Sequence, residues 1–495
     1  MSAAPLRGLL TGGLSASLIL GVAYTIAPVG APSRAAAQVG GDLCLSAEPP
    51  PDSAAPQRLR FGITPLAAGS AGGIQAQPKP ENPGVAQAEL SRLRPGRRQL
   101  VLHLNRMFMS DGETGVRRYA ALVDGYAAAG FDSELQVRYH PAVEQEGDMA
   151  VWTGYVRTAV RILGKRPSVK ALTITNEVNF PVSPNTSDGS FTGALQAIVT
   201  GVVAARHELD RIGRPDVELG FSFAWRWLPT SDADFWRQLG ALGTPEFGRA
   251  LDYVGLQIYP GLVWPPVSPA ASAGDDTVEA LTLLRDCYMP QAGLGRSVDL
   301  WVTENGYATN LGRTEAEQDL ALKSTLDAVY RYSGTLGVTD YRWFNLRDNN
   351  STGTDLFAAV GLLRDDYFEK PAFATYRSYI ERIGTDRPPI RRCGRRIATV
   401  LGTGGRDLLR GSKGPDVIAT GPGRDRVRGG RAADRICSGA GRDIVRGGLG
   451  SDIVNGGPGR DKLIGGPGAD RIRGGPGRDR CPGGRARDRI RGCGS

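Results

Sequence analysis

The sequence predicts an α/β fold, a (β/α)8 TIM barrel, followed by an all-β parallel β-roll or solenoid. Two observations carry this prediction. Through the middle of the chain, short runs rich in Val, Ile, Leu and aromatic residues start roughly every 34 to 48 residues, which is room for one strand, one helix and two loops. From residue 402 to residue 491, glycine-rich units of nine residues follow one another without a gap, as in proteins built from stacked coils.

Length and charge narrow the class of protein further. The chain has 495 residues, of which 22% are charged and 41% hydrophobic, and these values exclude a wholly disordered chain and a polytopic membrane protein. The net charge of +9 is divided unevenly: residues 386–495 hold 25 Lys and Arg against 11 Asp and Glu, a net +14, and the remainder is −5. The basic character therefore belongs to the tail and is no nucleic-acid signature of the whole protein.

Residues 1–37 have the features of a secretory signal peptide. Arg7 precedes a charge-free run over residues 8–33, and three alanines at 35–37 are the small residues that signal peptidase accepts. An uncleaved membrane anchor is the alternative, because the charge-free run is about long enough to span a bilayer. We expect a secreted or cell-surface protein, with a Pro-rich linker at residues 38–57.

The barrel is expected over residues 58–385. The eight expected strands are Leu59–Thr64, Leu100–Asn105, Leu135–Tyr139, Val169–Thr175, Val217–Ala224, Tyr253–Tyr259, Val298–Thr303 and Val338–Phe344. Between them, apolar residues at three- and four-residue spacing predict helices. The clearest of these are Gly115–Ala129, Ala150–Leu163, Thr192–Ile212 and Glu315–Tyr332. The runs alone also allow a doubly wound sheet, whereas the motifs described below favour the barrel.

Beyond a hinge at residues 386–401 that contains Pro and Arg, ten nine-residue units occupy the domain at residues 402–495. The sixth position of every unit is an aspartate: Asp407, Asp416, Asp425, Asp434, Asp443, Asp452, Asp461, Asp470, Asp479 and Asp488. The eighth position is aliphatic in nine units, with Cys481 as the exception. Glycine permits the positive-φ turns of such a coil, aspartate offers oxygen to a cation, and the aliphatic residue points into a thin core.

This pattern resembles the RTX (haemolysin-type) calcium-binding repeat, which forms a parallel β-roll. The resemblance covers the whole tail and implies that the ten aspartates bind Ca²⁺. The tail departs from the family pattern because arginine often flanks the aspartate, as at Arg424, Asp425 and Arg426. The alternative is therefore a solenoid of paired arginines and aspartates that binds Ca²⁺ weakly or not at all.

The six cysteines form an even set, which suits an oxidising exterior. Their connectivity does not follow from the sequence, but Cys481 and Cys493 are close enough in the chain to join the C-terminal end to itself. None of the cysteines lies in a C-x-x-C pair, so neither a zinc ribbon nor a thioredoxin-type site is expected.

Two glutamates follow apolar runs at the expected carboxyl ends of strands four and seven, where the chemistry of a (β/α)8 barrel is found. They are Glu177, in Thr-Asn-Glu, and Glu304, in Thr-Glu-Asn-Gly. Two carboxyls that face each other across a pocket suit the cleavage of a glycosidic bond, because one protonates the leaving oxygen while the other attacks the anomeric carbon.

These two motifs resemble the strand-four and strand-seven motifs of clan A glycoside hydrolases. The resemblance implies that Glu177 is the acid/base, that Glu304 is the nucleophile and that Asn176 hydrogen-bonds the 2-hydroxyl of the sugar. It also implies that Tyr259, at the end of strand six, hydrogen-bonds the nucleophile. Val178 follows the acid/base where many relatives have proline, which leaves the subfamily undecided.

Further residues at strand ends are candidates for substrate binding. Trp343 on strand eight is expected to form the apolar floor beneath the sugar, because a pyranose presents C–H groups to an aromatic face. His140 ends strand three and Arg106 ends strand two, where clan members often hold a polar residue near the nucleophile. Arg138 lies two residues before His140 on the same face, so the two compete for that position.

Several of these residues have a simpler interpretation. The two glutamates would be structural if they formed buried ion pairs with Arg138 and Arg106. Trp225, Trp227 and Trp264 are candidates for outer sugar subsites, although packing is the commoner role of single aromatic residues. His103 and His207 are expected to be structural.

The sequence thus predicts a secreted retaining glycoside hydrolase that acts on a glycoside, an oligosaccharide or a polysaccharide. Its tail would bind Ca²⁺, its catalysis would need no cofactor, and its basic tail is a candidate for contact with anionic cell-wall polymers. No nucleic-acid partner is expected. The alternative is a catalytically degenerate carbohydrate-binding or adhesion protein. Transglycosylation would use the same residues as hydrolysis.

Overall fold

The computed structural model describes residues 44–53, 56–66, 79–96, 98–181, 186–225, 229–386, 392–393, 396–402, 406–421, 423–482 and 488–494. The expected signal peptide lies outside these ranges, as does part of the expected linker. Among the described residues, no helix combines the length and the apolarity that a membrane span requires.

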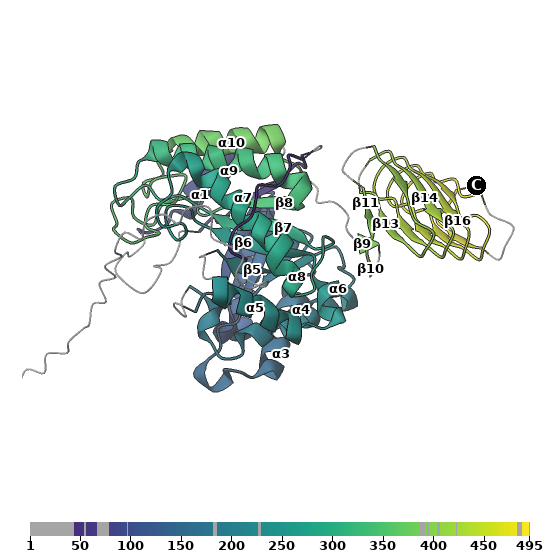
Figure 1. Cartoon of the computed structure of the whole chain (residues 1–495), viewed down its shortest axis with the longest axis horizontal. Helices are drawn as coiled ribbons and strands as arrows, with labels where there is room; N and C mark the ends of the chain where they lie inside the picture. The colour runs from purple at the N-terminus through teal and green to yellow at the C-terminus, as the bar shows by residue number, and fades with distance from the viewer. Residues whose placement is uncertain are drawn as a thin grey trace, which may run out of the picture. The chain divides into compact units, whose positions relative to one another are not determined.

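Eight parallel strands close into a barrel in chain order, as predicted (Figure 1). They are β1 (Arg60–Ile63), β2 (Val101–Phe108), β3 (Asp132–Arg138), β4 (Val169–Ile174), β5 (Glu218–Ala224), β6 (Tyr253–Ile258), β7 (Asp299–Asn305) and β8 (Val338–Trp343). Closure is complete because β1 pairs with both β2 and β8. The doubly wound alternative is therefore wrong.

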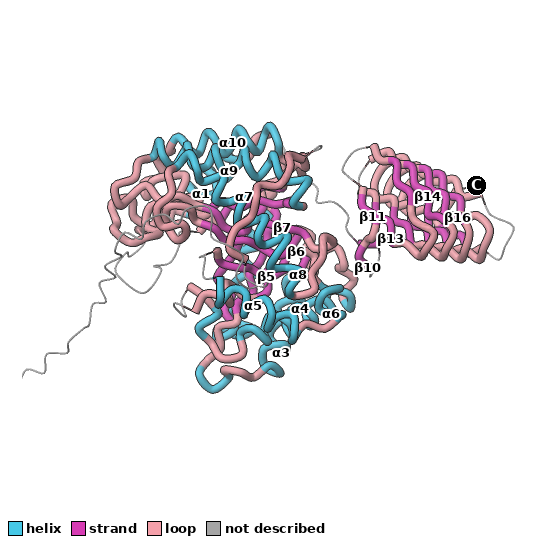
Figure 2. The backbone as a smooth tube through the Cα atoms, in the orientation of Figure 1, coloured by secondary structure: helices cyan, strands magenta, loops and turns pink. Residues whose placement is uncertain are grey.

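Helices surround the barrel (Figure 2). They are α1 (Pro83–Leu93), α2 (Gly112–Ala128), α3 (Met149–Leu163), α4 (Ala194–Arg211), α5 (Pro229–Leu242), α6 (Pro245–Ala250), α7 (Ala273–Leu283), α8 (Met289–Gln291), α9 (Glu315–Leu336) and α10 (Pro371–Ile383). Local sequence sets their ends: Asn82 accepts a hydrogen bond from the backbone of Val85 at the start of α1, and Thr314 and Glu317 form a capping box at the start of α9.

The two faces of each strand differ in chemistry. On β1 and β8, Phe61 and Tyr341 point outwards, and both rings contact Tyr376 of α10. Their neighbours Arg60 and Arg342 point towards the barrel axis and are fully buried. Alternation along a strand thus separates an apolar layer, between strands and helices, from a charged interior.

The charged interior is held together by short ion pairs. Asp340 accepts hydrogen bonds from Arg60 at 2.6 Å and from Arg342 at 2.7 Å, and Arg342 also donates to Glu134 at 2.9 Å. The Arg60 guanidinium lies 4.8 Å from the centre of the Trp301 ring. Because buried charges are costly unless they are paired, these contacts make the interior of the barrel a fixed polar network.

The repeat domain (residues 402–495), together with the end of the expected hinge, folds as a solenoid with two parallel sheets, drawn as magenta strands in Figure 2. One sheet holds β11 (Val400–Leu401), β13 (Val417–Ala419), β15 (Arg435–Cys437), β17 (Ile453–Asn455), β19 (Arg471–Arg473) and β20 (Arg489–Arg491); the other holds β12 (Leu408–Arg410), β14 (Arg426–Gly430), β16 (Ile444–Gly448) and β18 (Lys462–Ile464). Each residue pairs with the residue 18 positions later, for example Val427 with Val445, so two nine-residue units make one coil. The predicted β-roll is confirmed.

The aliphatic eighth positions form the thin core of the repeat domain. They are Ile418, Val427, Ile436, Val445, Val454, Leu463 and Ile472, all at most 2% exposed. Before these coils, β9 (Arg392–Cys393) and β10 (Arg396–Ile397) form a short antiparallel pair within the expected hinge.

Three disulfides use all six cysteines. Cys44 is bonded to Cys287, Cys393 to Cys437, and Cys481 to Cys493. The expected pairing of Cys481 with Cys493 is therefore confirmed. The first disulfide joins residues 243 positions apart and fixes the segment before β1 to the region after α7.

Candidate active site

Glu304 lies near the end of β7, where a β-bulge decides which way its side chain points. Leu256 of β6 pairs with Val302, but the next residue, Gln257, pairs with Glu304, so Thr303 is an extra residue on β7. An extra residue reverses the alternation beyond it. The bulge therefore turns the Glu304 carboxylate towards the barrel interior, where its side chain is 9% exposed.

Tyr259, directly after β6, holds this carboxylate. Its hydroxyl donates a hydrogen bond of 2.7 Å to Oε2 of Glu304, so the contact implied by the resemblance is present. Burial raises the pKa of Tyr259 well above its usual value, and the negative charges of Glu304 and Glu177 raise it further. The phenol therefore keeps its proton and remains a donor.

His103 of β2 lies on the other side of the same carboxylate. Its Nε2 is 3.5 Å from Oε1 of Glu304, and its Nδ1 is 3.3 Å from Oε1 of Glu134 on β3. Burial alone would lower the pKa of His103, but the two carboxylates outweigh it and raise the pKa to about 9. The imidazole is thus a cation at neutral pH, placed between two anions.

Glu134 connects this histidine to the charged interior. Its second carboxylate oxygen accepts the hydrogen bond from Arg342, and Oε1 accepts one from Thr173 at 2.9 Å. Burial raises the pKa of Glu134, but the charges of His103 and Arg342 outweigh that effect and lower it to about 2. His103 was expected to be structural, whereas the structure places it beside Glu304. Its position on an expected strand, three residues before Arg106, was the signal available.

Asn176 and Glu177 follow β4 on backbone that turns sharply. Thr175 and Glu177 have φ angles of 68° and 47°, in the left-handed region that residues other than glycine seldom adopt. Such strain persists only where surrounding contacts impose it, and it is concentrated at functional sites. Here the Glu177 backbone is held on both sides, because its N–H donates to Ser222 and its carbonyl accepts from Ser187.

The Asn176 amide is oriented by its neighbours. Its Oδ1 accepts hydrogen bonds from Gln136 at 2.8 Å, Gln257 at 2.9 Å and Ser222 at 3.2 Å. Because the acceptor side of the amide is saturated, the Nδ2 group must point away from these three donors, and one of its hydrogens bonds the carbonyl of Thr186.

Arg138 does not pair with a glutamate of the site. Its Nε donates to Oδ1 of Asp188 at 2.7 Å, and Oδ2 of Asp188 accepts from the backbone N–H groups of Tyr139 and Asn176. Arg138 therefore supports the turn after β4 through Asp188. The interpretation in which Arg138 and a glutamate form a structural pair is not supported.

The other polar candidates are less central. His140 is half-buried between Phe108 and Phe191, and its Nδ1 lies 3.3 Å from the Ser110 hydroxyl. Arg106 lies within a second irregularity in strand pairing, between Leu104 and Met107 of β2. Burial lowers the pKa of Arg106. The two contacts with the Glu304 carboxylate described above come from Tyr259 and His103, and not from His140 or Arg106.

The structure does not place Trp343 where a sugar platform is expected. Its side chain points outwards into the apolar layer, is 1% exposed and donates a hydrogen bond to the carbonyl of Val360 at 3.1 Å. The next residue, Phe344, packs edge-on against Tyr259 with ring centres 6.0 Å apart. Since Tyr259 contacts Glu304, Phe344, which directly follows β8, is an aromatic ring that lies next to the site.

Among the remaining aromatic and histidine candidates, Trp225 is buried in the apolar layer near Tyr288, which confirms packing as its role. Trp264 is half-buried against the same layer, and Trp227 lies outside the described residues. His207 lies on α4 and pairs with Glu246 at 2.7 Å on the surface, so its expected structural role is confirmed.

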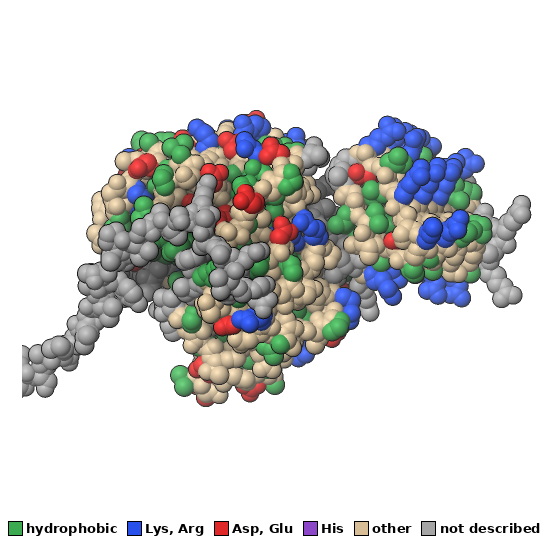
Figure 3. Space-filling model, viewed as in Figure 1, with side chains coloured by type: hydrophobic (Ala, Val, Ile, Leu, Met, Phe, Trp, Pro, Cys, Tyr) green, Lys and Arg blue, Asp and Glu red, His purple; other side chains and the backbone are tan. Residues whose placement is uncertain are grey.

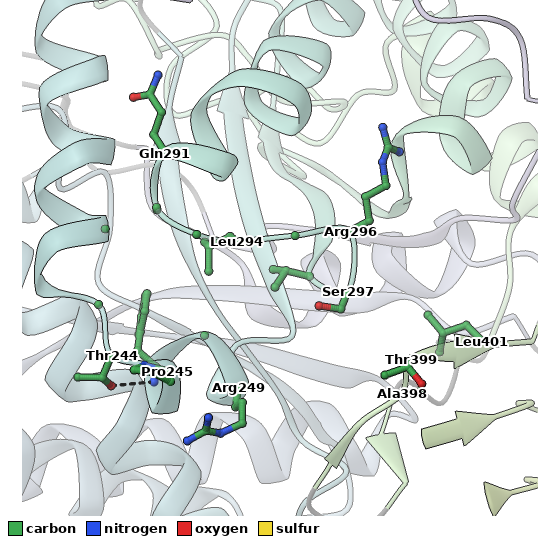
Figure 4. Close-up of a pocket in the computed structure, with 18 residues that line it drawn as sticks. Thr244, Pro245, Arg249, Gln291, Leu294, Arg296, Ser297, Ala398, Thr399 and Leu401 are labelled. Carbon is green, nitrogen blue, oxygen red and sulfur yellow. Dashed lines mark hydrogen bonds between the residues drawn. The ribbon is translucent and has the colours of Figure 1, made fainter. Parts of the chain in front are cut away.

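The barrel residues drawn in Figure 4 form a wall that does not belong to this site. They include Thr244, Arg249, Gln291, Leu294 and Arg296. These residues lie in α6, in α8 and in the segments before β6 and β7, so this part of the wall is at the amino-terminal face of the strands. The glutamates are at the opposite, carboxyl-terminal face, where the reactions of such barrels take place.

The aspartates of the repeat domain form a second candidate site. From Asp407 to Asp470, each backbone N–H donates to Oδ1 of the aspartate 18 residues later, at 2.8–3.1 Å. The other carboxylate oxygen is buried and has no hydrogen-bond partner in seven of them: Asp425, Asp434, Asp443, Asp452, Asp461, Asp470 and Asp479. Pairing of these seven with the flanking arginines, the alternative to calcium binding, is therefore not observed.

The donor set of this ladder fits a calcium ion. Among the described residues, no group of three or more His, Cys, Asp or Glu side chains is arranged to hold a metal ion, so an ion here would combine aspartate with backbone carbonyls, both of which Ca²⁺ accepts. Glycine at the first position leaves room: a Cβ at Gly429 would lie 2.5 Å from Oδ2 of Asp434. Burial raises the pKa of Asp443 and Asp452 to about 7, with neighbouring aspartates adding to the effect, as expected of carboxylates that lack a counter-ion.

Taken together, the chain is a (β/α)8-barrel protein with a C-terminal calcium-binding repeat domain. The RTX calcium-binding nonapeptide repeat (4 copies) matches residues 401–436, 432–463, 446–481 and 455–490. The C-terminal region therefore carries RTX repeats, and RTX repeats bind Ca²⁺. No curated protein matches the sequence.

Solved structures with a similar fold are remote in sequence. A GH5_18 protein from Streptomyces cattleya, in complex with GlcNAc, is 16% identical over 72% of this chain and 86% of its own, with a TM-score of 0.45. The exo-beta-1,4-mannosidase Op5Man5 from Opitutaceae bacterium strain TAV5 is 14% identical over 72% of this chain and 63% of its own, with a TM-score of 0.47. At this distance neither assigns a substrate to this chain.

Proposed function

We propose that the barrel is a retaining glycoside hydrolase, with Glu304 as the nucleophile and Glu177 as the acid/base. The observation that carries this proposal is the environment of Glu304: a bulge turns it inwards, Tyr259 donates to one oxygen and the His103 cation lies beside the other. These contacts fix the orientation of the carboxylate. Glu177 follows β4 at the same face of the barrel.

In the first step, an oxygen of Glu304 bonds to the anomeric carbon as the glycosidic C–O bond breaks, and the Glu177 carboxylic acid gives its proton to the departing oxygen. In the second step, Glu177, now a carboxylate, takes a proton from water. The water oxygen bonds to the anomeric carbon, and Glu304 leaves as a carboxylate. Asn176, whose acceptor side is saturated, is placed to donate to a sugar hydroxyl, and Phe344 supplies an apolar edge near the sugar.

The substrate under this proposal is a glycoside, an oligosaccharide or a polysaccharide. The signal-like N-terminus supports secretion or display at the cell surface, in keeping with three disulfides and an RTX domain. Calcium would serve the repeat domain, and the catalytic steps need only the side chains named above.

The test is to incubate the full chain with 2,4-dinitrophenyl 2-deoxy-2-fluoro glycosides of the gluco, galacto, manno and xylo series and then to map peptides by mass. A fluoroglycosyl adduct on Glu304 is the expected result, and Glu304→Gln is the control that should stay unlabelled. If an active preparation carries its adduct on another residue, the assignment is wrong. If no glycoside of the four series labels the protein, and none is hydrolysed by it, a catalytically degenerate carbohydrate-binding barrel becomes the better interpretation.

A further inference from the structure

The repeat domain carries a straight column of arginines along one edge. Its members occupy the fifth position of alternate units: Arg406, Arg424, Arg442, Arg460 and Arg478. All five are exposed. In the described residues, the equivalent position on the other edge holds Pro415, Ala433, Ser451 and Ala469. The column is therefore a property of one edge of the solenoid.

Backbone pairing fixes the alignment of this column. Gly423 pairs with Gly441, Gly441 with Gly459, and Gly459 with Gly477, and each of these glycines directly precedes an arginine of the column. Neighbouring strands in a sheet lie about 4.8 Å apart, so successive arginines rise by about that distance along the solenoid. The guanidinium groups form a linear array.

The adjoining sheet extends the positive surface. Exposed Lys and Arg side chains on β12, β14, β16 and β18 are Arg410, Arg426, Arg428, Arg446 and Lys462, and the exposed Arg480 pairs with Lys462 in the next coil. Figure 3 shows such side chains gathered over the repeat domain. The arginine column and these six residues together are called the basic face below.

The basic face has no internal counter-charge in the part of the repeat domain that the structure describes. An aspartate follows each arginine of the column, but those from Asp425 to Asp479 are at most 3% exposed, and their Oδ1 atoms accept backbone N–H groups. No ion pair within 4.0 Å joins the basic face to a carboxylate there. Stacked like charges repel one another, so an external polyanion would stabilise this surface.

The shape and composition of the surface favour one kind of polyanion. No Phe, Trp or Tyr occurs after Tyr379, so the domain has no aromatic side chain on which nucleic-acid bases would stack. A straight array with one guanidinium per coil matches an extended chain that carries one carboxylate per sugar. We propose that the basic face binds an acidic polysaccharide, with its carboxylates aligned along the arginine column.

Calcium should strengthen this binding. Residues 402–495 hold 20 Lys and Arg and 10 Asp, a net +10, and all ten of the acidic residues belong to the aspartate ladder. Calcium bound at the ladder offsets those negative charges, so the outward field of the domain becomes more positive. This inference concerns the repeat domain and does not depend on the activity proposed for the barrel.

The test is binding of calcium-loaded, full-length protein to a short oligogalacturonate, measured by calorimetry at physiological salt. We expect binding that weakens as salt rises, and no binding of the same oligomer after methyl esterification of its carboxyls. The triple variant Arg424→Gln, Arg442→Gln, Arg460→Gln should bind at least about tenfold more weakly. The matched control, Lys413→Gln, Arg431→Gln, Arg473→Gln, removes three charges from other faces and should change affinity by less than about twofold.

Three outcomes would overturn the proposal: no binding of the oligogalacturonate, equal losses in the two triple variants, or tighter binding of a DNA duplex of matched charge. The outcome is separable from the activity of the barrel. Both triple variants should hydrolyse a small neutral glycoside at the same rate as the unmodified protein. Conversely, Glu304→Gln should bind the oligogalacturonate with unchanged affinity.

Discussion

Nε2 of His103 lies 3.5 Å from Oε1 of Glu304, so the candidate nucleophile has a buried cation on one side and the Tyr259 phenol on the other. The other nitrogen of the His103 ring lies beside Glu134, which accepts a hydrogen bond from Arg342. Glu304 is therefore the outermost member of a charge network in the barrel interior. We infer that His103 is a positioning residue for Glu304, because its contact is with the carboxylate.

The first prediction concerns pH. Folding raises the pKa of His103 to about 9, above its ordinary value of 6.5, so its charge stabilises the site fully below pH 6.5 and is lost as pH rises through about 9. Activity should therefore fall with an alkaline limb near pH 9. His103→Gln should lower kcat by about tenfold and abolish this limb, as measured by pH–rate profiles on a glycoside that the protein cleaves.

His207→Gln, on the surface of α4, is the control, and its pH–rate profile should retain the alkaline limb near pH 9. Thermal unfolding of both variants identifies any loss of activity that arises from misfolding. An alkaline limb that persists in folded His103→Gln would show that another group titrates there.

A second prediction isolates the Tyr259 hydrogen bond. Tyr259→Phe removes one donor to the nucleophile, and a hydrogen bond to a charged group contributes about 1.5–3 kcal/mol. We expect kcat to fall by about 10- to 150-fold with little change in the melting temperature. Tyr379→Phe is a matched control, because its hydroxyl bonds Asp327 on the outer helices. Similar kinetics in the two variants would contradict the role of Tyr259.

A third prediction separates the two domains by calcium. Chelation should unfold the repeat domain, because its buried carboxylates then have no cation, while the barrel should keep its structure. Calorimetry should show two transitions, of which one moves to lower temperature in EGTA. Limited proteolysis should then release fragments from the region after residue 386. If EGTA changes the temperature of neither transition, the result would count against metal binding by the aspartates of the repeat domain.

The fourth prediction concerns the Cys44–Cys287 disulfide, which closes a loop of 243 residues around most of the barrel. Such a constraint limits the unfolded chain, and losing it typically costs about 2–5 kcal/mol of unfolding free energy. Cys44→Ser with Cys287→Ser should lower the barrel transition. The control, Cys481→Ser with Cys493→Ser, removes a disulfide that spans only 12 residues of the repeat domain and should leave the barrel transition in place.

The order and spacing of the apolar runs were enough to predict all eight barrel strands, because a buried parallel strand needs a continuous apolar stretch. The direction of individual side chains could not be predicted in the same way. Strict alternation turns Glu304 outwards, and only the pairing between strands reveals the extra residue at Thr303. Trp343 and Phe344 show the same limit, since adjacent aromatic residues differ in which face they occupy.

His103 was missed for a related reason. Nothing in its local sequence distinguishes a core histidine from one beside a nucleophile, because the contact depends on β3 and β7. In the repeat domain, by contrast, the nine-residue period predicted the β-roll and its aliphatic core, since every unit repeats the same pattern of glycine, aspartate and apolar residues. The alternative of arginine–aspartate pairs is not observed, because burial directs the aspartates inwards and leaves the arginines outside.

The pairing of residues 18 positions apart has a consequence for how the repeat domain can change over evolution. Duplication or loss of an 18-codon segment adds or removes one complete coil, and every later coil keeps its phase. Loss of nine codons would instead move every later strand into the opposite sheet. The later arginines of the column would then lie on the other edge. Selection for an unbroken column would therefore favour length variants that differ by even numbers of units.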